Sequence, residues 1–69
     1  MIKFGDWLSA FKGVDRPIGD LANDMLSEND TDLFNQVNSV EELPFFSSQT
    51  VHTVAINAFN YYLVDVSGQ

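Results

Sequence analysis

The sequence of 69 residues has no cysteine, one histidine and only three basic residues. Without cysteine the chain has no disulfide, no thiolate metal ligand and no thiol nucleophile, which fits a reducing compartment. No segment approaches the ~18 apolar residues of a membrane-spanning helix, and the first residues lack the basic flank and apolar stretch of a signal peptide. We therefore expect a cytoplasmic protein that does not associate with membranes.

The few bases are also unevenly placed. All three fall within the first sixteen residues, whereas residues 17–69 hold eight acidic residues and no base. Contacts to nucleic-acid phosphates or anionic lipids need Lys or Arg, so we expect no direct binding to either. A protein partner with a basic surface would suit this charge, although excess acid also simply keeps small proteins soluble.

The residues needed for catalysis or metal binding are scarce. His52 is the only candidate general base, and no serine near it stands in a nucleophile motif. Residues 28–32 offer carboxylate and amide oxygens but lack the spacing of a calcium loop, and a single histidine without cysteine excludes zinc. The four glycines are scattered and form no phosphate-binding loop. We expect no enzymatic activity, no metal and no cofactor.

Apolar residues recur with helical periodicity and predict one all-α domain over residues 1–69, a compact four- to five-helix bundle. The predicted helices cover residues 3–12, 17–28, 40–46 and 48–66, with a loop or short turn over 29–38. In the first helix the apolar residues follow the i, i+3, i+4, i+7 pattern, and Gly13 then favours a helix end.

Local signals refine these boundaries. Asp15 is expected to cap the second helix, with Pro17 in its first turn. Around residue 33 we expect three apolar side chains to enter the core from a loop or turn, namely Leu33, Phe34 and Val37. Ser39 and Glu42 have the spacing of a capping box. The last helix is apolar around much of its circumference, which is typical of a central helix.

The first two helices also carry a recognisable pattern. Phe4-x-x-Trp7-Leu8-x-x-Phe11 followed by Asp15-x-Pro17-Ile18-Gly19-Asp20-Leu21-Ala22-x-Asp24 resembles the YozE-like family of small bacterial proteins. The resemblance covers residues 4–26 and is thin beyond them. It implies a sterile-alpha-motif-like (SAM-like) helical fold and brings no catalytic residues. Domains of that fold class bind proteins or nucleic acids, which is an analogy of fold only.

Two surfaces are candidates for binding. Asp20, Asp24 and Glu28 recur every four residues along the second helix, a row of carboxylates about 6 Å apart. Like charges at this spacing cost a few tenths of a kcal/mol per pair, so an uncompensated row hints at a docking face. Glu41 and Glu42 would extend this acidic surface. A solvated helix surface is the alternative interpretation.

The second candidate surface is aromatic. Phe45-Phe46 and Tyr61-Tyr62 are adjacent pairs, and neighbours on a helix point about 100° apart. One member of each pair should therefore face solvent, and we expect Phe45 and Tyr61 to serve as anchors for a partner. A small bundle that buries most of these rings is the alternative interpretation.

These observations predict a small acidic protein-interaction module whose partner is a protein. An alternative is an acidic inhibitor of phage or mobile-element origin that imitates nucleic acid and blocks a nucleic-acid-binding protein. Duplex DNA carries a charge about every 1.7 Å, so this mimicry would need the 28–32 turn and Glu41-Glu42 in addition to the helical row. Self-association is a third possibility, and it predicts a concentration-dependent mass in solution.

Overall fold

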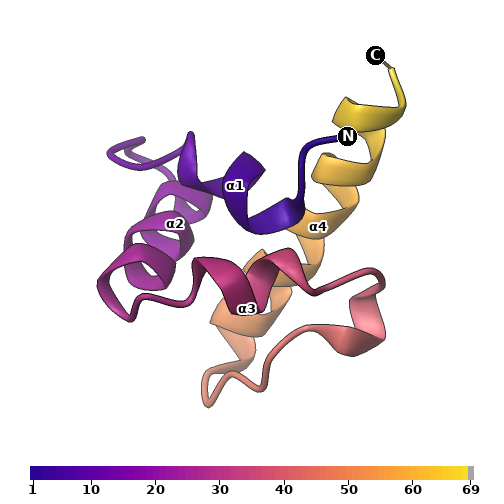
Figure 1. Cartoon of the computed structure of the whole chain (residues 1–69). Coiled ribbons are helices and arrows are strands. Elements are labelled where there is room, and N and C mark those ends of the chain that lie inside the picture. The colour runs from indigo at the N-terminus through magenta and orange to yellow at the C-terminus, as the bar shows by residue number, and fades with distance from the viewer. Residues whose placement is uncertain (69) are drawn as a thin grey trace.

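Along residues 1–68, four α-helices and one 3-10 turn follow one another (Figure 1). The computed structural model describes residues 1–68. The elements are α1 (Phe4–Ser9), α2 (Pro17–Ser27), α3 (Thr31–Asn35), η1 (Val40–Glu42) and α4 (Gln49–Ser67). Because the described residues contain no strand, the predicted all-α class is confirmed. None of the helices in this range is long and apolar enough to cross a membrane.

The longest helix, α4, is the element against which much of the bundle assembles. It contacts α1, α2 and η1, while α3 packs against α1 and α2. The first residues of the chain lie beside the last turns of α4 (Figure 1). Ser48 caps the helix by accepting a hydrogen bond from the Val51 N–H at 3.4 Å. The predicted start at residue 48 differs by one residue from the observed start at Gln49.

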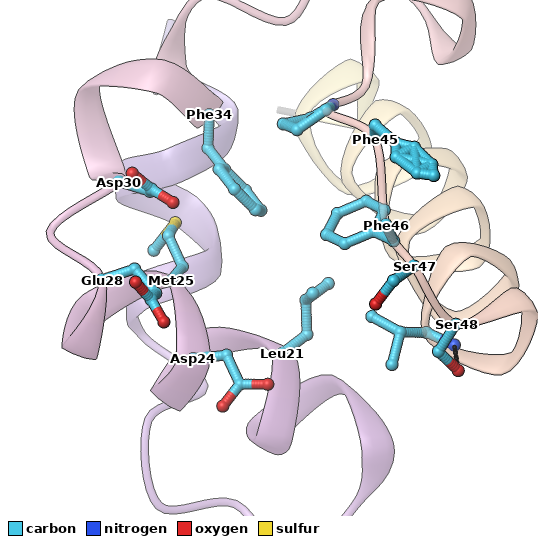
Figure 2. A pocket seen from close by; sticks show the side chains of 12 residues that line it. Leu21, Asp24, Met25, Glu28, Asp30, Phe34, Phe45, Phe46, Ser47 and Ser48 are labelled. Atoms are coloured by element: carbon cyan, nitrogen blue, oxygen red, sulfur yellow. Dashed lines mark hydrogen bonds between the residues drawn. The ribbon is translucent and has the colours of Figure 1, made fainter.

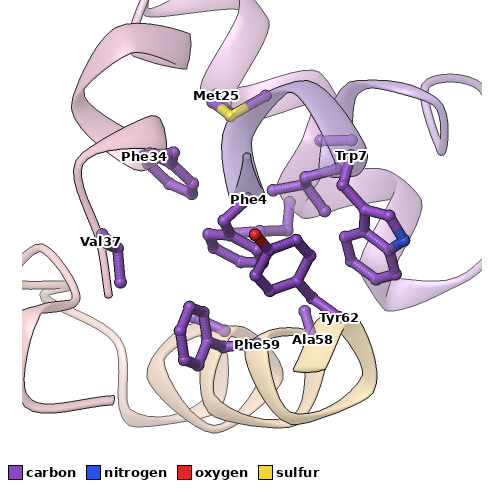
Figure 3. Close-up of a cluster of buried hydrophobic side chains, with 12 residues drawn as sticks. Phe4, Trp7, Met25, Phe34, Val37, Ala58, Phe59 and Tyr62 are labelled. Carbon is purple, nitrogen blue, oxygen red and sulfur yellow. The ribbon is translucent and has the colours of Figure 1, made fainter. Parts of the chain in front are cut away.

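The core is built around the ring of Phe4 (Figure 3). Its centroid lies 5.9 Å from that of Phe34, 5.0 Å from Phe59 and 5.4 Å from Tyr62. These separations fall in the range where stacked and edge-to-face aromatic pairs add to the burial energy. The predicted apolar faces supply most of the core, which consists of twelve buried residues: Phe4, Trp7, Leu8, Leu21, Ala22, Met25, Phe34, Val37, Ala55, Ala58, Phe59 and Tyr62.

The first helix is shorter than predicted. Regular α-helix ends at Ser9 instead of residue 12, and the next residues form tighter turns such as the bond from the Phe11 N–H to the Leu8 carbonyl at 2.9 Å. Gly13 then adopts a φ of +83°, a left-handed conformation that glycine reaches without a steric penalty. Gly13 therefore lies in the connection between α1 and α2, beyond the observed end of the first helix.

The prediction that Asp15 caps α2 is wrong. The helix begins at Pro17 and its N-cap is Arg16, which is extended and makes no side-chain cap bond. Asp15 stands one residue too early to occupy the cap position. Pro17 occupies the first helical position, where the backbone N–H has no partner within the helix and proline is favoured.

The middle of the chain differs most from the prediction. Residues 29–38 contain α3, and Phe34 and Val37 are buried as expected. Leu33, however, remains 46% exposed because a five-residue helix turns only one side toward the core.

The predicted helix over 40–46 is only the three-residue turn η1, since Pro44 follows closely and cannot donate a backbone hydrogen bond. Neither bond of the predicted capping box is formed. Ser39 makes no side-chain cap bond, but the Glu42 carboxylate accepts a hydrogen bond at 2.8 Å from the Asn38 N–H, one residue before the cap.

Candidate binding surface

The acidic row of α2 forms one wall of a groove (Figure 2). Asp24 and Glu28 line this groove, which has a volume of about 420 Å³, together with Asp30 just beyond the helix. Its apolar floor includes Leu21 and Met25. The groove therefore combines carboxylates at its edge with apolar surface at its base.

The end of α2 explains why Asp30 joins this wall. Asn29 adopts a left-handed φ of 58°, which Asn tolerates better than most residues. The Asp30 N–H then donates to the Met25 carbonyl at 2.9 Å, and the Asn29 N–H donates to the Leu26 carbonyl at 3.1 Å. This pair of bonds is the Schellman pattern of helix ends, and it turns the chain so that Asp30 stays beside Glu28.

The opposite wall is the segment that leads into α4 (Figure 2). Phe46 points into the groove toward Phe34, with their ring centroids 6.4 Å apart, and is half-buried. Phe45 is 84% exposed at the rim. The predicted division of this pair is thus observed, and it places an unburied aromatic ring across from the carboxylates of α2.

Tyr61 lies on a different part of the surface. It is 52% exposed, whereas its neighbour Tyr62 is buried, so the second aromatic pair also divides as predicted. Its ring meets the edge of Trp7 at a centroid distance of 5.3 Å. It lines a second hollow of about 560 Å³ between α4 and the start of α2, which also includes Ile18 and Arg16.

A smaller hollow of about 240 Å³ lies between these two, and it contains Asp20. Pro17 and Val54 line both this hollow and the one beside Tyr61, while Asp24 and Val51 line both this hollow and the first groove. The three hollows therefore adjoin one another in a row along the seam of α2 and α4. We call this row of hollows the α2–α4 trough.

Glu41 and Glu42 do not line the α2–α4 trough, although both are exposed. They lie on η1, and Glu42 bonds to the Asn38 backbone as described above. The structure thus groups Asp20, Asp24 and Glu28 with Phe45 at one end and Tyr61 at the other. Sequence reasoning did not predict that Arg16 and Phe34 would join them, because only the packing of helices brings these positions together.

His52 lies on α4 outside the trough. It is partly buried, and its ring centroid lies 6.0 Å from that of Phe46. Within residues 1–68, no three side chains of His, Cys, Asp or Glu are arranged to hold a metal ion. The chemistry offered by the trough is therefore that of carboxylates, aromatic rings and apolar surface.

Comparisons with protein-family models, with characterised proteins and with solved structures find no match to this chain. The resemblance of residues 4–26 to the YozE-like family therefore stays a prediction.

Proposed function

We propose that this protein is a non-enzymatic interaction module that binds a partner protein through the α2–α4 trough. The observation that carries the proposal is the placement of Phe45, an 84% exposed aromatic ring, across a groove from Asp24 and Glu28. Aromatic rings contribute strongly to binding when they are desolvated at an interface. Carboxylates around them favour basic partners and speed association.

The charge of the whole chain supports the same partner chemistry. The net charge is −7, and no base follows residue 17 in the sequence. A basic partner is therefore attracted at long range before the groove makes its specific contacts. The partner surface that fits best presents Lys or Arg beside apolar side chains.

A charge-matched pair of variants tests this proposal. The trough variant combines Asp20→Asn, Asp24→Asn and Glu28→Gln, and the control combines Asp6→Asn, Asp32→Asn and Glu41→Gln, so each removes three exposed carboxylates. Partners would be captured from a cell lysate at low salt and identified by mass spectrometry, then purified and titrated. We expect the trough variant to bind at least about tenfold more weakly and the control to keep its affinity.

Equal affinity of the two variants for the purified partner would refute the trough as the binding site, provided that far-UV circular dichroism shows both to be folded. Phe45→Ala offers a second measure, with an expected loss of about tenfold or more if the ring is an anchor. Competition by duplex DNA for the same partner would instead favour the nucleic-acid-mimicking inhibitor.

A further inference from the structure

The α2–α4 trough has the length of a short helix. Its α2 wall comprises eleven residues, which at 1.5 Å per residue span about 16 Å. The trough begins beside Arg16 and Tyr61 and ends beside Asp30 and Phe45. An apolar strip that includes Val54, Val51 and Phe46 runs between these ends.

Charge is distributed unequally around the trough in two directions. Across it, the α2 side carries Asp20, Asp24 and Glu28, whereas the α4 positions that line it are uncharged. Along it, the only base among the lining residues is Arg16 at the start of α2, and the opposite end has Glu28 and Asp30. A ligand that matches this pattern is therefore basic along one side and has a positive and a negative end.

We infer that the α2–α4 trough binds an amphipathic helix of the partner, lying antiparallel to α2 with its amino-terminal end beside Glu28 and Asp30. This inference rests on the proposed function and specifies its ligand. Lys or Arg at every fourth position of the bound helix recurs about every 6 Å, the spacing of the carboxylates on α2. The apolar stripe of the bound helix covers the strip between the walls, with Phe45 and Tyr61 at its two ends.

The helix dipole selects the orientation. The amino-terminal end of a helix carries a partial positive charge and the carboxy-terminal end a partial negative charge. The first is attracted by Glu28 and Asp30, and the second by Arg16. Along α2 and α4 an extended peptide fits less well, because the backbone groups of these two helices are already paired and offer no sheet edge for strand addition.

Synthetic peptides test the ligand class. The test peptide has about 16 residues with capped ends, a Leu stripe at helical spacing and Lys at every fourth position beside it. Its matched control carries Glu in place of each Lys. By fluorescence anisotropy at low salt, we expect the Lys peptide to bind at least about tenfold more tightly, and the trough variant to lose this preference while the charge-matched control variant keeps it. Equal binding of the two peptides would overturn the inference.

Nuclear magnetic resonance tests the orientation. The protein has no cysteine, so a nitroxide can be attached to a single cysteine at either end of the peptide without labelling the protein. A label at the amino terminus should broaden the backbone signals of Glu28, Asp30 and Phe45, and a label at the carboxy terminus those of Arg16 and Asn57. The reverse pattern would overturn the antiparallel placement.

The two proposals can fail separately. If the trough variant loses its cellular partner but neither peptide binds the unmodified protein, the bound helix is wrong and the interaction module stands. If the trough variant and its charge-matched control bind the partner equally well, the proposed site is wrong and the inference falls with it.

Discussion

Two regions of this small protein use aromatic residues in opposite ways. The junction of α1 with α4 buries Phe4, Trp7 and Tyr62, whereas residues 38–48 include no fully buried side chain and leave Phe45 84% exposed. The segments that pack against α4 in the two regions are both short, since α1 has six residues and η1 has three. The difference between them is therefore tertiary.

The α1–α4 junction is tied by bonds between residues far apart in sequence. The Trp7 Nε1–H donates to Asp65 Oδ2 at 2.7 Å, and the Tyr62 hydroxyl donates to the Ile2 carbonyl at 2.7 Å. By contrast, the side-chain bond within residues 38–48 joins neighbours, from the Asn38 N–H to Glu42 Oε1. We infer that the junction carries the stability of the fold, while the 38–48 segment is available for binding.

Phe4→Ala tests whether the α1–α4 junction carries the stability of the fold. Replacing a fully buried ring by a methyl group costs about 3–5 kcal/mol, and the total stability of a chain of this length is about 3–10 kcal/mol. We expect the variant to be largely unfolded or close to it, as measured by urea unfolding followed by circular dichroism. A loss below about 1 kcal/mol would show that the rings around Phe4 are not the centre of the fold.

Gly5→Ala should separate α1 from α3. A Cβ atom at this position would lie 2.6 Å from Asn35 Oδ1 and would also collide with the Thr31 carbonyl. Although alanine favours helix, the helices must move apart, and we expect a loss of about 1–3 kcal/mol in thermal or urea unfolding. Gly68→Ala is the control, because the added atom there meets backbone oxygens at 3.7 Å and should be nearly neutral.

Tyr62→Phe tests how much one hydrogen bond of the α1–α4 junction contributes to the free energy of unfolding. The bond to the Ile2 carbonyl is partly buried, so its loss should cost about 0.5–1.5 kcal/mol. Tyr61→Phe removes a hydroxyl from a half-exposed ring on the same helix and should change stability much less. Equal effects in urea unfolding would show that the bond does not hold the first residues onto α4.

Phe45→Ala should have the smallest effect on stability. Because the ring is exposed, we expect a change within about 0.5 kcal/mol. The same variant should bind the basic test peptide more weakly, which separates the binding role of the 38–48 segment from the structural role of the junction. A large loss of stability with unchanged peptide affinity would reverse this division.

The sequence alone predicted which helix faces are buried. In the first helix the i, i+3, i+4, i+7 pattern predicted Phe4, Trp7, Leu8 and Phe11 on one face, and the first three are buried while Phe11 is partly buried. It also predicted the outward position of one residue in each aromatic pair, namely Phe45 and Tyr61. The buried face of α1 and the division of Tyr61 from Tyr62 depend on interactions within about one turn of helix, so the order of residues is enough to determine them. Phe45 and Phe46 lie outside any helix, so their division depends on the packing around them.

Other features could not be read from neighbouring residues. Leu33 has the chemistry of a core residue, yet the placement of α3 against α1 leaves it exposed. The predicted helix over residues 40–46 is only the three-residue turn η1, which contacts α4 but none of the other helices of the described residues. A short helix gains most of its stability from tertiary contacts, so its extent depends on the rest of the fold.

The candidate site shows the same separation. The carboxylate row of Asp20, Asp24 and Glu28 could be predicted from the sequence, because a four-residue spacing on a helix places them on one face. The position of Phe45 across a groove from this row, with Glu41 and Glu42 outside the groove, depends on the tertiary structure. The spacing of residues along a helix is fixed by its backbone hydrogen bonds. The placement of a loop beside that helix depends instead on how all the buried side chains pack into one core.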